Sequence, residues 1–390
     1  MLPRENGSGE SPNSAPSEEE HPILIFSGVG EHASPEPPPD YDVFHQRVLA
    51  EDWDRVCQPT TLVGLLKNPA VTSNPEALIE VANVIAIVSQ NPNFGARLRS
   101  ALGQAGVVVP LTRLFIENSP SATSRVLVIG HILNAVVSLC ANHPQNQAAF
   151  GREGIVAPLT ALLGTIPDIN TLPGELVEPV LVAISHLSSD PDNRAAFGEP
   201  AVIDSLVRIV ASAADPARAT DPVVARALLS AVSQLALDPH NRASFGRTAM
   251  IPQLVRLLVS NQALATHPIV AEAFFSAIDH LAYRSPQNQT VFRQAGIVPV
   301  LADLLVAGRL GPATRSLLGA IVKLTDACPE NGAAFLGTRL LDRLRAAPQV
   351  RPGPGGPPPP PDPRPARPPI FQPLAPAQLA DELEQLFRGQ

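Results

Sequence analysis

The chain has 390 residues, of which 45% are hydrophobic and only 4% aromatic, and its formal net charge is −8. Nine acidic residues and a single base, Arg4, lie in residues 1–42, so the other 348 residues carry 27 acids and 27 bases. Such a balance excludes the basic surplus with which a nucleic-acid-binding protein contacts phosphates. Three widely separated cysteines, Cys57, Cys140 and Cys328, argue against a disulfide scaffold or a zinc site and favour a reducing compartment.

Composition divides the chain into four segments. Residues 1–42 form an acidic tail that we expect to be disordered, and residues 43–346 form an apolar, repetitive array. Residues 347–376 are a proline-rich linker, and residues 377–390 form a short amphipathic helix. The most apolar stretch, Val126–Cys140, is too short to span a bilayer. We therefore expect a soluble protein of the cytoplasm, with the nucleus also possible, and no membrane insertion.

Two phrases recur through the array at nearly constant spacing. The phrase Leu-x-x-Leu-Leu, or a close variant, begins every 47–49 residues at Leu62, Leu111, Leu159, Leu206, Leu254 and Leu301. The phrase Asn-x-x-x-Phe follows nearly the same period, with a shorter last step of 43 residues, and ends at Phe150, Phe197, Phe245, Phe292 and Phe335. A fixed period of this length is typical of stacked repeats. We interpret the leucines and phenylalanines as core residues, although Leu-x-x-Leu-Leu is also a coactivator docking motif.

Each repeat is predicted to contain three helices. In the fifth, Asn288 is a candidate N-cap of the first helix, and Gly296 can take the left-handed conformation that ends it. Apolar residues at helical spacing after Ile297 indicate the second helix. The preceding third helix, Ile269–Tyr283, is apolar over most of its circumference, which is typical of a helix buried between neighbours.

Two segments, 145–163 and 287–305, resemble the armadillo repeat family in the order of their Asn, Gly, Pro and Leu residues. The resemblance covers about three quarters of the chain and implies a right-handed α-solenoid of six to seven three-helix repeats. The longer period and the substitutions Ala201, Ala249 and Arg339 at the glycine position depart from the family pattern. Helical pairs of the HEAT type are the nearest alternative, and they lack the glycine phrase.

The resemblance also locates a candidate binding row on the third helices. Peptide-binding members of the family carry an Asn there, whereas this chain has Ala86 followed by a polar row consisting of Ser138, His186, Gln234, His280 and Lys323. Asn134 and Asp279 are neighbouring candidates. The absence of Asn from this row argues against nuclear-import cargo. The row either hydrogen-bonds an extended peptide or is a solvated face without selectivity, and the sequence leaves both interpretations open.

The C-terminal segments offer two further candidate ligands. Pro357, Pro358, Pro359, Pro360 and Pro361 form a run that suits SH3- or profilin-type grooves, although a spacer role is favoured. In the final helix, Leu379, Leu383 and Phe387 share one face. We expect this helix to dock on the protein's own surface as a lid, or on a partner.

No catalytic or cofactor-binding motif is present in the sequence, and His186 and His280 are two repeats apart, too far to share a metal. We therefore expect no enzyme activity, no cofactor and no metal. The sequence predicts a protein–protein interaction scaffold that binds a partner, either an extended peptide or a folded domain, on its concave face. The alternatives are a regulator or chaperone of a small GTPase, and a cytoskeletal adaptor that acts through the proline-rich tail.

Overall fold

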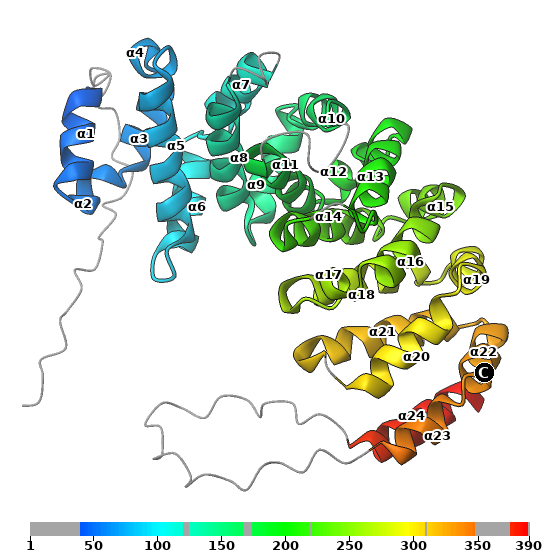
Figure 1. Cartoon of the computed structure of the whole chain (residues 1–390). Coiled ribbons are helices and arrows are strands. Elements are labelled where there is room, and N and C mark those ends of the chain that lie inside the picture. The colour runs from blue at the N-terminus through cyan, green and yellow to red at the C-terminus, as the bar shows by residue number, and fades with distance from the viewer. Residues whose placement is uncertain are drawn as a thin grey trace, which may run out of the picture.

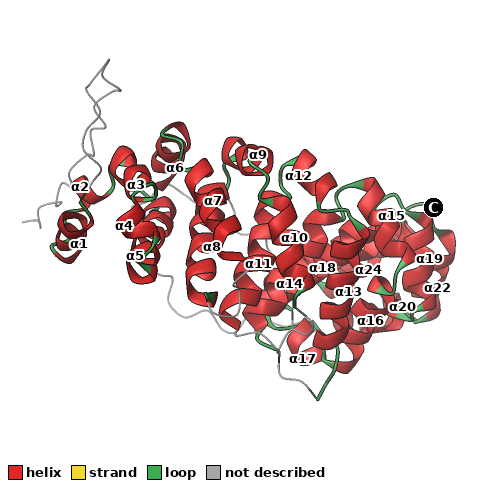
Figure 2. Ribbon diagram, turned by 90° about the horizontal axis from the view of Figure 1, so that it is seen from above, coloured by secondary structure: helices red, strands yellow, loops and turns green. Residues whose placement is uncertain are grey.

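The computed structural model describes residues 40–119, 125–166, 174–217, 220–308, 310–347 and 375–388. These residues form helices and no strand, and the helices stack into a curved solenoid (Figure 1). Figure 2 shows the same stack from above, with successive repeats following one another along its length. The predicted all-α solenoid is thus confirmed.

Each repeat contributes a first, a second and a third helix. The first helices are α6 (Gly95–Gln104), α9 (Pro144–Arg152), α12 (Pro191–Ala196), α15 (Pro239–Arg247), α19 (Pro286–Gln294) and α22 (Pro329–Gly337). The second helices are α3 (Pro59–Leu65), α7 (Val108–Asn118), α10 (Val156–Gly164), α13 (Pro200–Ala213), α16 (Met250–Ser260), α20 (Ile297–Ala307) and α23 (Leu340–Ala346). The third helices are α5 (Pro75–Gln90), α8 (Val126–Cys140), α11 (Gly174–Leu187), α14 (Pro222–Leu235), α18 (Pro268–Ala282) and α21 (Thr314–Thr325).

Shorter elements complete the array. Helices α1 (Tyr41–Leu49) and α2 (Trp53–Val56) precede the first repeat. Helices α4 (Pro69–Thr72) and α17 (Gln262–Ala265) lie between second and third helices, and a 3-10 turn at Gly311–Ala313 precedes α21. The last helix, α24 (Pro376–Arg388), packs against α22 and α23 at the end of the stack (Figure 1).

One continuous aliphatic core runs through the stack. The third helices pack on one another in sequence, from α5 through α21, and they line the inner side of the curve (Figure 1). The first leucine of each Leu-x-x-Leu-Leu phrase and the repeated phenylalanines are fully buried. These residues are therefore core, as interpreted from the sequence, and are not docking motifs.

The repeated asparagines connect neighbouring repeats. In each, the Nδ2 group donates to a carbonyl oxygen of the preceding repeat's first helix: Asn146 to Arg99, Asn193 to Gln147, Asn241 to Arg194, Asn288 to Arg242 and Asn331 to Gln289, at 2.8–3.2 Å. Four of them also donate to the end of the third helix of the preceding repeat, as Asn288 does to the Leu281 carbonyl at 2.8 Å. We call this series the asparagine ladder.

The prediction that Asn288 is an N-cap was wrong. The N-cap of α19 is Ser285, whose hydroxyl accepts from the backbone N–H of Asn288 at 3.4 Å. His143, Asp190 and Asp238 cap α9, α12 and α15 in the same way. Because a residue three positions earlier satisfies the free N–H, the asparagine side chain is available to bridge the repeats.

A glycine faces most rungs of the ladder. Gly103, Gly151, Gly198 and Gly246 lie where an added Cβ would overlap Oδ1 of the asparagine in the next repeat. Only a residue without a Cβ allows the two helices to approach so closely. Gly296, by contrast, has the left-handed φ of 85° expected from the sequence, and Arg339 takes the same conformation with φ of 56°.

Acid is expected to destabilise the protein through His143. The Nδ1 atom of His143 accepts from the backbone N–H of Asn146 at 3.2 Å, and Nε2 lies 2.9 Å from Oγ of Ser100. Burial and, secondarily, the Arg99 guanidinium lower the pKa of His143 below its ordinary value of 6.5. The unfolded chain therefore binds the proton first, so stability is complete above about pH 6.5 and decreases as the pH falls toward the lowered folded-state pKa.

Substituting His143→Ser tests this expectation, because Ser285 already serves as the equivalent cap of α19. Urea unfolding at about pH 7.5 and about pH 5.5 should show a smaller loss of stability in the variant than in the parent. An unchanged pH dependence would mean that His143 does not contribute to it.

Candidate functional site

The predicted polar row lies on the third helices, and most of it reaches the surface. His186, Gln234, His280 and Lys323 occupy the same position on α11, α14, α18 and α21, and each is partly exposed. Asn134 on α8 is exposed. The exposed and partly exposed residues of the third helices form what we call the concave face.

Ser138 does not belong to this surface. Its side chain is 1% exposed, and its Oγ accepts from Nε2 of Gln90 at 2.7 Å and donates to the Asn134 carbonyl at 2.8 Å. Gln90, at the end of α5, covers the hydroxyl, so a partner cannot reach Ser138. Asn134, one turn earlier on α8, is a polar residue exposed to solvent.

A hollow of about 300 Å³ lies between α14 and α18 and contains two of the predicted residues. Gln234 and His280 both line it, together with Arg226, Ser230, Ser233, Ile269, Glu272, Ala273 and Ser276. The hollow is bordered by hydroxyl, amide, imidazole and charged groups with an apolar patch at Ile269. Such a lining offers donors and acceptors to a peptide backbone and room for a side chain.

His280 is held in place across two repeats. Its Nδ1 atom lies 2.8 Å from Oγ of Ser233 and 3.0 Å from the Ser233 carbonyl oxygen. Ser233 is only 5% exposed. The ring is thereby fixed toward the hollow, with its second nitrogen on the side away from Ser233.

Charged groups shape the ends of the concave face. Burial and, secondarily, the Arg226 guanidinium lower the pKa of His186, so this imidazole is neutral at physiological pH. The pKa of Asp279 is raised, because burial outweighs the opposing effect of the neighbouring His280 and Lys323. The cations of Lys323, Arg284 and Arg242 lie 5.1, 5.2 and 5.5 Å from the centre of the Tyr283 ring. Three cations therefore lie close to this ring, beside the α18–α21 end of the face.

Sequence reasoning did not identify the charged members of the hollow as site residues. Arg226 and Ser230 precede Gln234 by two turns and one turn, and Glu272 and Ser276 bear the same relation to His280. The signal that could have found them is helical periodicity, since residues at these spacings share one face of a helix.

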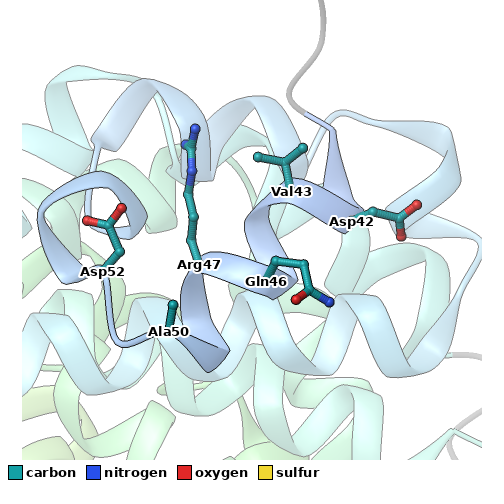
Figure 3. Close-up of a pocket in the computed structure, with 6 residues that line it drawn as sticks. All are labelled: Asp42, Val43, Gln46, Arg47, Ala50 and Asp52. Atoms are coloured by element: carbon teal, nitrogen blue, oxygen red, sulfur yellow. The ribbon is translucent and has the colours of Figure 1, made fainter.

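A second hollow, of about 370 Å³, lies at helix α1 and the turn between α1 and α2 (Figure 3). It is lined by Asp42, Val43, Gln46, Arg47, Ala50 and Asp52. The labelled side chains in Figure 3 point in different directions and do not converge on one point. It is therefore a weaker candidate than the hollow between α14 and α18.

The structure places Leu383 and Phe387 in contact with the protein's own array. Both side chains are buried, at 4% and 7% exposure, and the Phe387 ring stacks on Phe335 with centroids 5.6 Å apart. Arg345 Nη2 lies 2.8 Å from Asp381 Oδ1 and 2.5 Å from Glu384 Oε2. Helix α24 thus caps the end of the solenoid instead of covering the concave face as a lid. The candidate ligand Pro357–Pro361 lies outside the described residues.

Within the described part of the chain, no group of three or more His, Cys, Asp or Glu side chains is arranged to hold a metal ion. No single described helix has both the length and the apolarity needed to cross a membrane, although the pair Pro286–Gln294 and Ile297–Ala307, bent by 80°, meets that test jointly.

Neither a family model nor a curated protein matches this sequence. Solved structures do match. An engineered protein aligns with a TM-score of 0.59 and 19% identity over 79% of this chain and 66% of its own length. A designed armadillo repeat protein aligns at 0.54 with 16% identity over 68% of this chain and 99% of its own. Another, solved in complex with the peptide (KR)4, aligns at 0.53 with 16% identity over 68% and 99%. With the three-helix repeats and the asparagine ladder, these similarities establish that the chain folds as an armadillo-type helical solenoid.

Proposed function

We propose that this protein is a non-enzymatic scaffold that binds an extended segment of a partner protein along its concave face. The observation that carries the proposal is the hollow between α14 and α18, where Gln234 and His280 are brought together with further polar side chains. An extended peptide has unpaired backbone N–H and C=O groups, and polar side chains at regular intervals can pair with them.

Two further observations support this proposal. Polar residues recur at one position on α11, α14, α18 and α21, so the binding surface repeats with the fold. One of the structural neighbours was solved in complex with the peptide (KR)4. A long surface built from repeats suits a ligand that is itself linear.

Affinity capture from native cell extract, read by mass spectrometry, tests the proposal. The variant Gln234→Ala, His280→Ala and Lys323→Glu should bind its partners about a hundredfold more weakly, since each lost hydrogen bond or charge contributes roughly 1 kcal/mol. A matched control carries the same three kinds of substitution at exposed positions away from the third helices: Gln262→Ala, His240→Ala and Lys67→Glu.

The proposal requires that the control retain the partners that the concave variant loses. Equal capture by both variants would exclude the concave face as the binding surface. Capture of a folded GTPase only in one nucleotide state would favour the regulator of small GTPases. Partners whose capture depends on residues 347–376 would favour the cytoskeletal adaptor. The SH3- or profilin-type contact of this segment stays a prediction.

A further inference from the structure

A second row of side chains on the third helices alternates in charge. Glu178, Arg226, Glu272 and Arg315 lie on α11, α14, α18 and α21, each eight residues before a member of the polar row. Eight residues are slightly more than two helical turns, so each pair lies on one face of its helix. Arg226, Glu272 and Arg315 are exposed, and Glu178 is partly exposed. We call these four residues the charge row.

The charge row borders the same groove as the polar row. Arg226 and Glu272 both line the hollow between α14 and α18. After burial, the Arg226 guanidinium also contributes to lowering the pKa of His186 on α11. Among the described residues, no ion pair joins Arg226 to Glu272, and neither side chain forms a hydrogen bond. Their charges are therefore not neutralised by each other.

Spacing relates the row to a linear ligand. Helices that pack side by side lie about 8–10 Å apart, and α11, α14, α18 and α21 pack in this order. A chain in the extended polyproline II conformation advances about 3.1 Å per residue with three residues per turn, so one turn of ligand, about 9 Å, passes each repeat. Side chains three residues apart then lie on the same face of the ligand and can meet successive members of the row.

We propose that the concave face selects an extended peptide whose charges alternate in sign at intervals of about three residues. Lysine or arginine of the ligand pairs with Glu178 and Glu272, and aspartate or glutamate pairs with Arg226 and Arg315. This inference rests on the proposed function and adds to it the chemical class of the ligand. A surface ion pair contributes about two- to fivefold to a binding constant, so the pattern as a whole should contribute about tenfold or more.

A peptide array tests the proposal with the full-length protein. Peptides carry Lys or Glu, in all combinations, at the first, fourth, seventh and tenth positions, with Ser and Gly between them. Alternating peptides should retain the protein about tenfold better than blocked peptides of the same composition, which have two Lys followed by two Glu. Both orders of alternation are included because a ligand can run in either direction. The preference should decrease at high salt, where exposed charges are screened.

A charge-exchanged variant, Arg226→Glu with Glu272→Arg, supplies the decisive comparison. The exchange keeps the net charge and turns the row from alternating into two acids followed by two bases. The variant should therefore prefer the blocked peptides over the alternating ones, by a similar factor in the opposite direction. Circular dichroism and the thermal midpoint establish that it is folded, as expected for a change confined to exposed positions.

The outcomes separate this inference from the proposed function. If the parent and the exchanged variant show the same charge preference, the charge row does not select the ligand. In that case the proposed function still stands, provided that Gln234→Ala, His280→Ala and Lys323→Glu together lower retention on all peptides. If no peptide retains the protein, or if that triple variant is retained as well as the parent, both proposals fail.

Discussion

Replacing Gly198 with Ala is expected to lower the free energy of unfolding by about 1–3 kcal/mol, the usual cost of overpacking an interior. The added methyl group would overlap Oδ1 of Asn241, and it would lie 3.0 Å from the carbonyl oxygen of Ala195. Asn241 cannot move aside without loss, because its Nδ2 group donates to the Arg194 carbonyl at 2.9 Å. Urea unfolding followed by circular dichroism measures the change.

Gly164→Ala is the matched control. Gly164 ends helix α10, and no heavy atom lies within 4 Å of the position that its Cβ would take. Alanine there should be neutral or stabilising by up to about 1 kcal/mol, because it favours the helix more than glycine does. A comparable loss in both variants would show that the effect comes from the backbone and not from the asparagine.

A double-mutant cycle isolates the contact further. Asn241→Ala alone removes a hydrogen bond between repeats and is expected to cost about 1 kcal/mol or more. In the double variant, the methyl group at residue 198 no longer meets an amide oxygen. The loss of unfolding free energy in the double variant should therefore be smaller than the sum of the losses in the two single variants. Strict additivity would contradict the close approach of Gly198 and Asn241.

Substituting both Leu383→Asp and Phe387→Asp is expected to release α24 from the end of the solenoid. Both side chains are buried against the array, and leaving a carboxylate buried without a partner costs several kcal/mol. A helix that packs against α22 and α23 alone cannot offset that cost. Hydrogen exchange should increase in α24 and then in α22 and α23, whereas the central repeats keep their protection.

The control for this experiment adds the same charge to the same helix. Gln378→Asp and Gln385→Asp lie at exposed positions of α24 and should leave the cap docked. If both double variants exchange alike, helix propensity and not the buried face holds α24 in place. If neither changes, α24 does not depend on Leu383 and Phe387.

The period of the sequence predicted the architecture because the same positions of every repeat are buried and must therefore be apolar. Phe150 and its counterparts fill the same interior position in every repeat, so the pattern reports the core directly. The polar row was also largely recoverable, since Gln234 and His280 share a helical position and meet at one hollow. In a repeat protein, one sequence shows several residues at each structural position, so a pattern at that position can be recognised without relatives.

The remaining features depend on contacts that one sequence does not reveal. Asn288 has the residue type of an N-cap, yet Ser285 takes that role, and only the neighbouring repeat shows why the asparagine is needed. Ser138 follows the periodicity of the polar row, but Gln90 of the previous repeat covers it. The sequence also left the docking surface of α24 undetermined. The amphipathic pattern of a helix shows that one face is covered, but it does not show which surface covers that face.

The asparagine ladder sets the boundaries at which repeats could be exchanged. Because four of the five rungs place a glycine in or just after one first helix against the asparagine of the next, the transferable module extends from one such asparagine to the residue before the following one. A module excised in that register leaves a glycine opposite an asparagine at the new junction. One excised elsewhere, for instance between a second and a third helix, joins surfaces that were never complementary. Repeats can therefore be added to or removed from this protein without unfolding it only if the chain is cut in the register of the asparagine ladder.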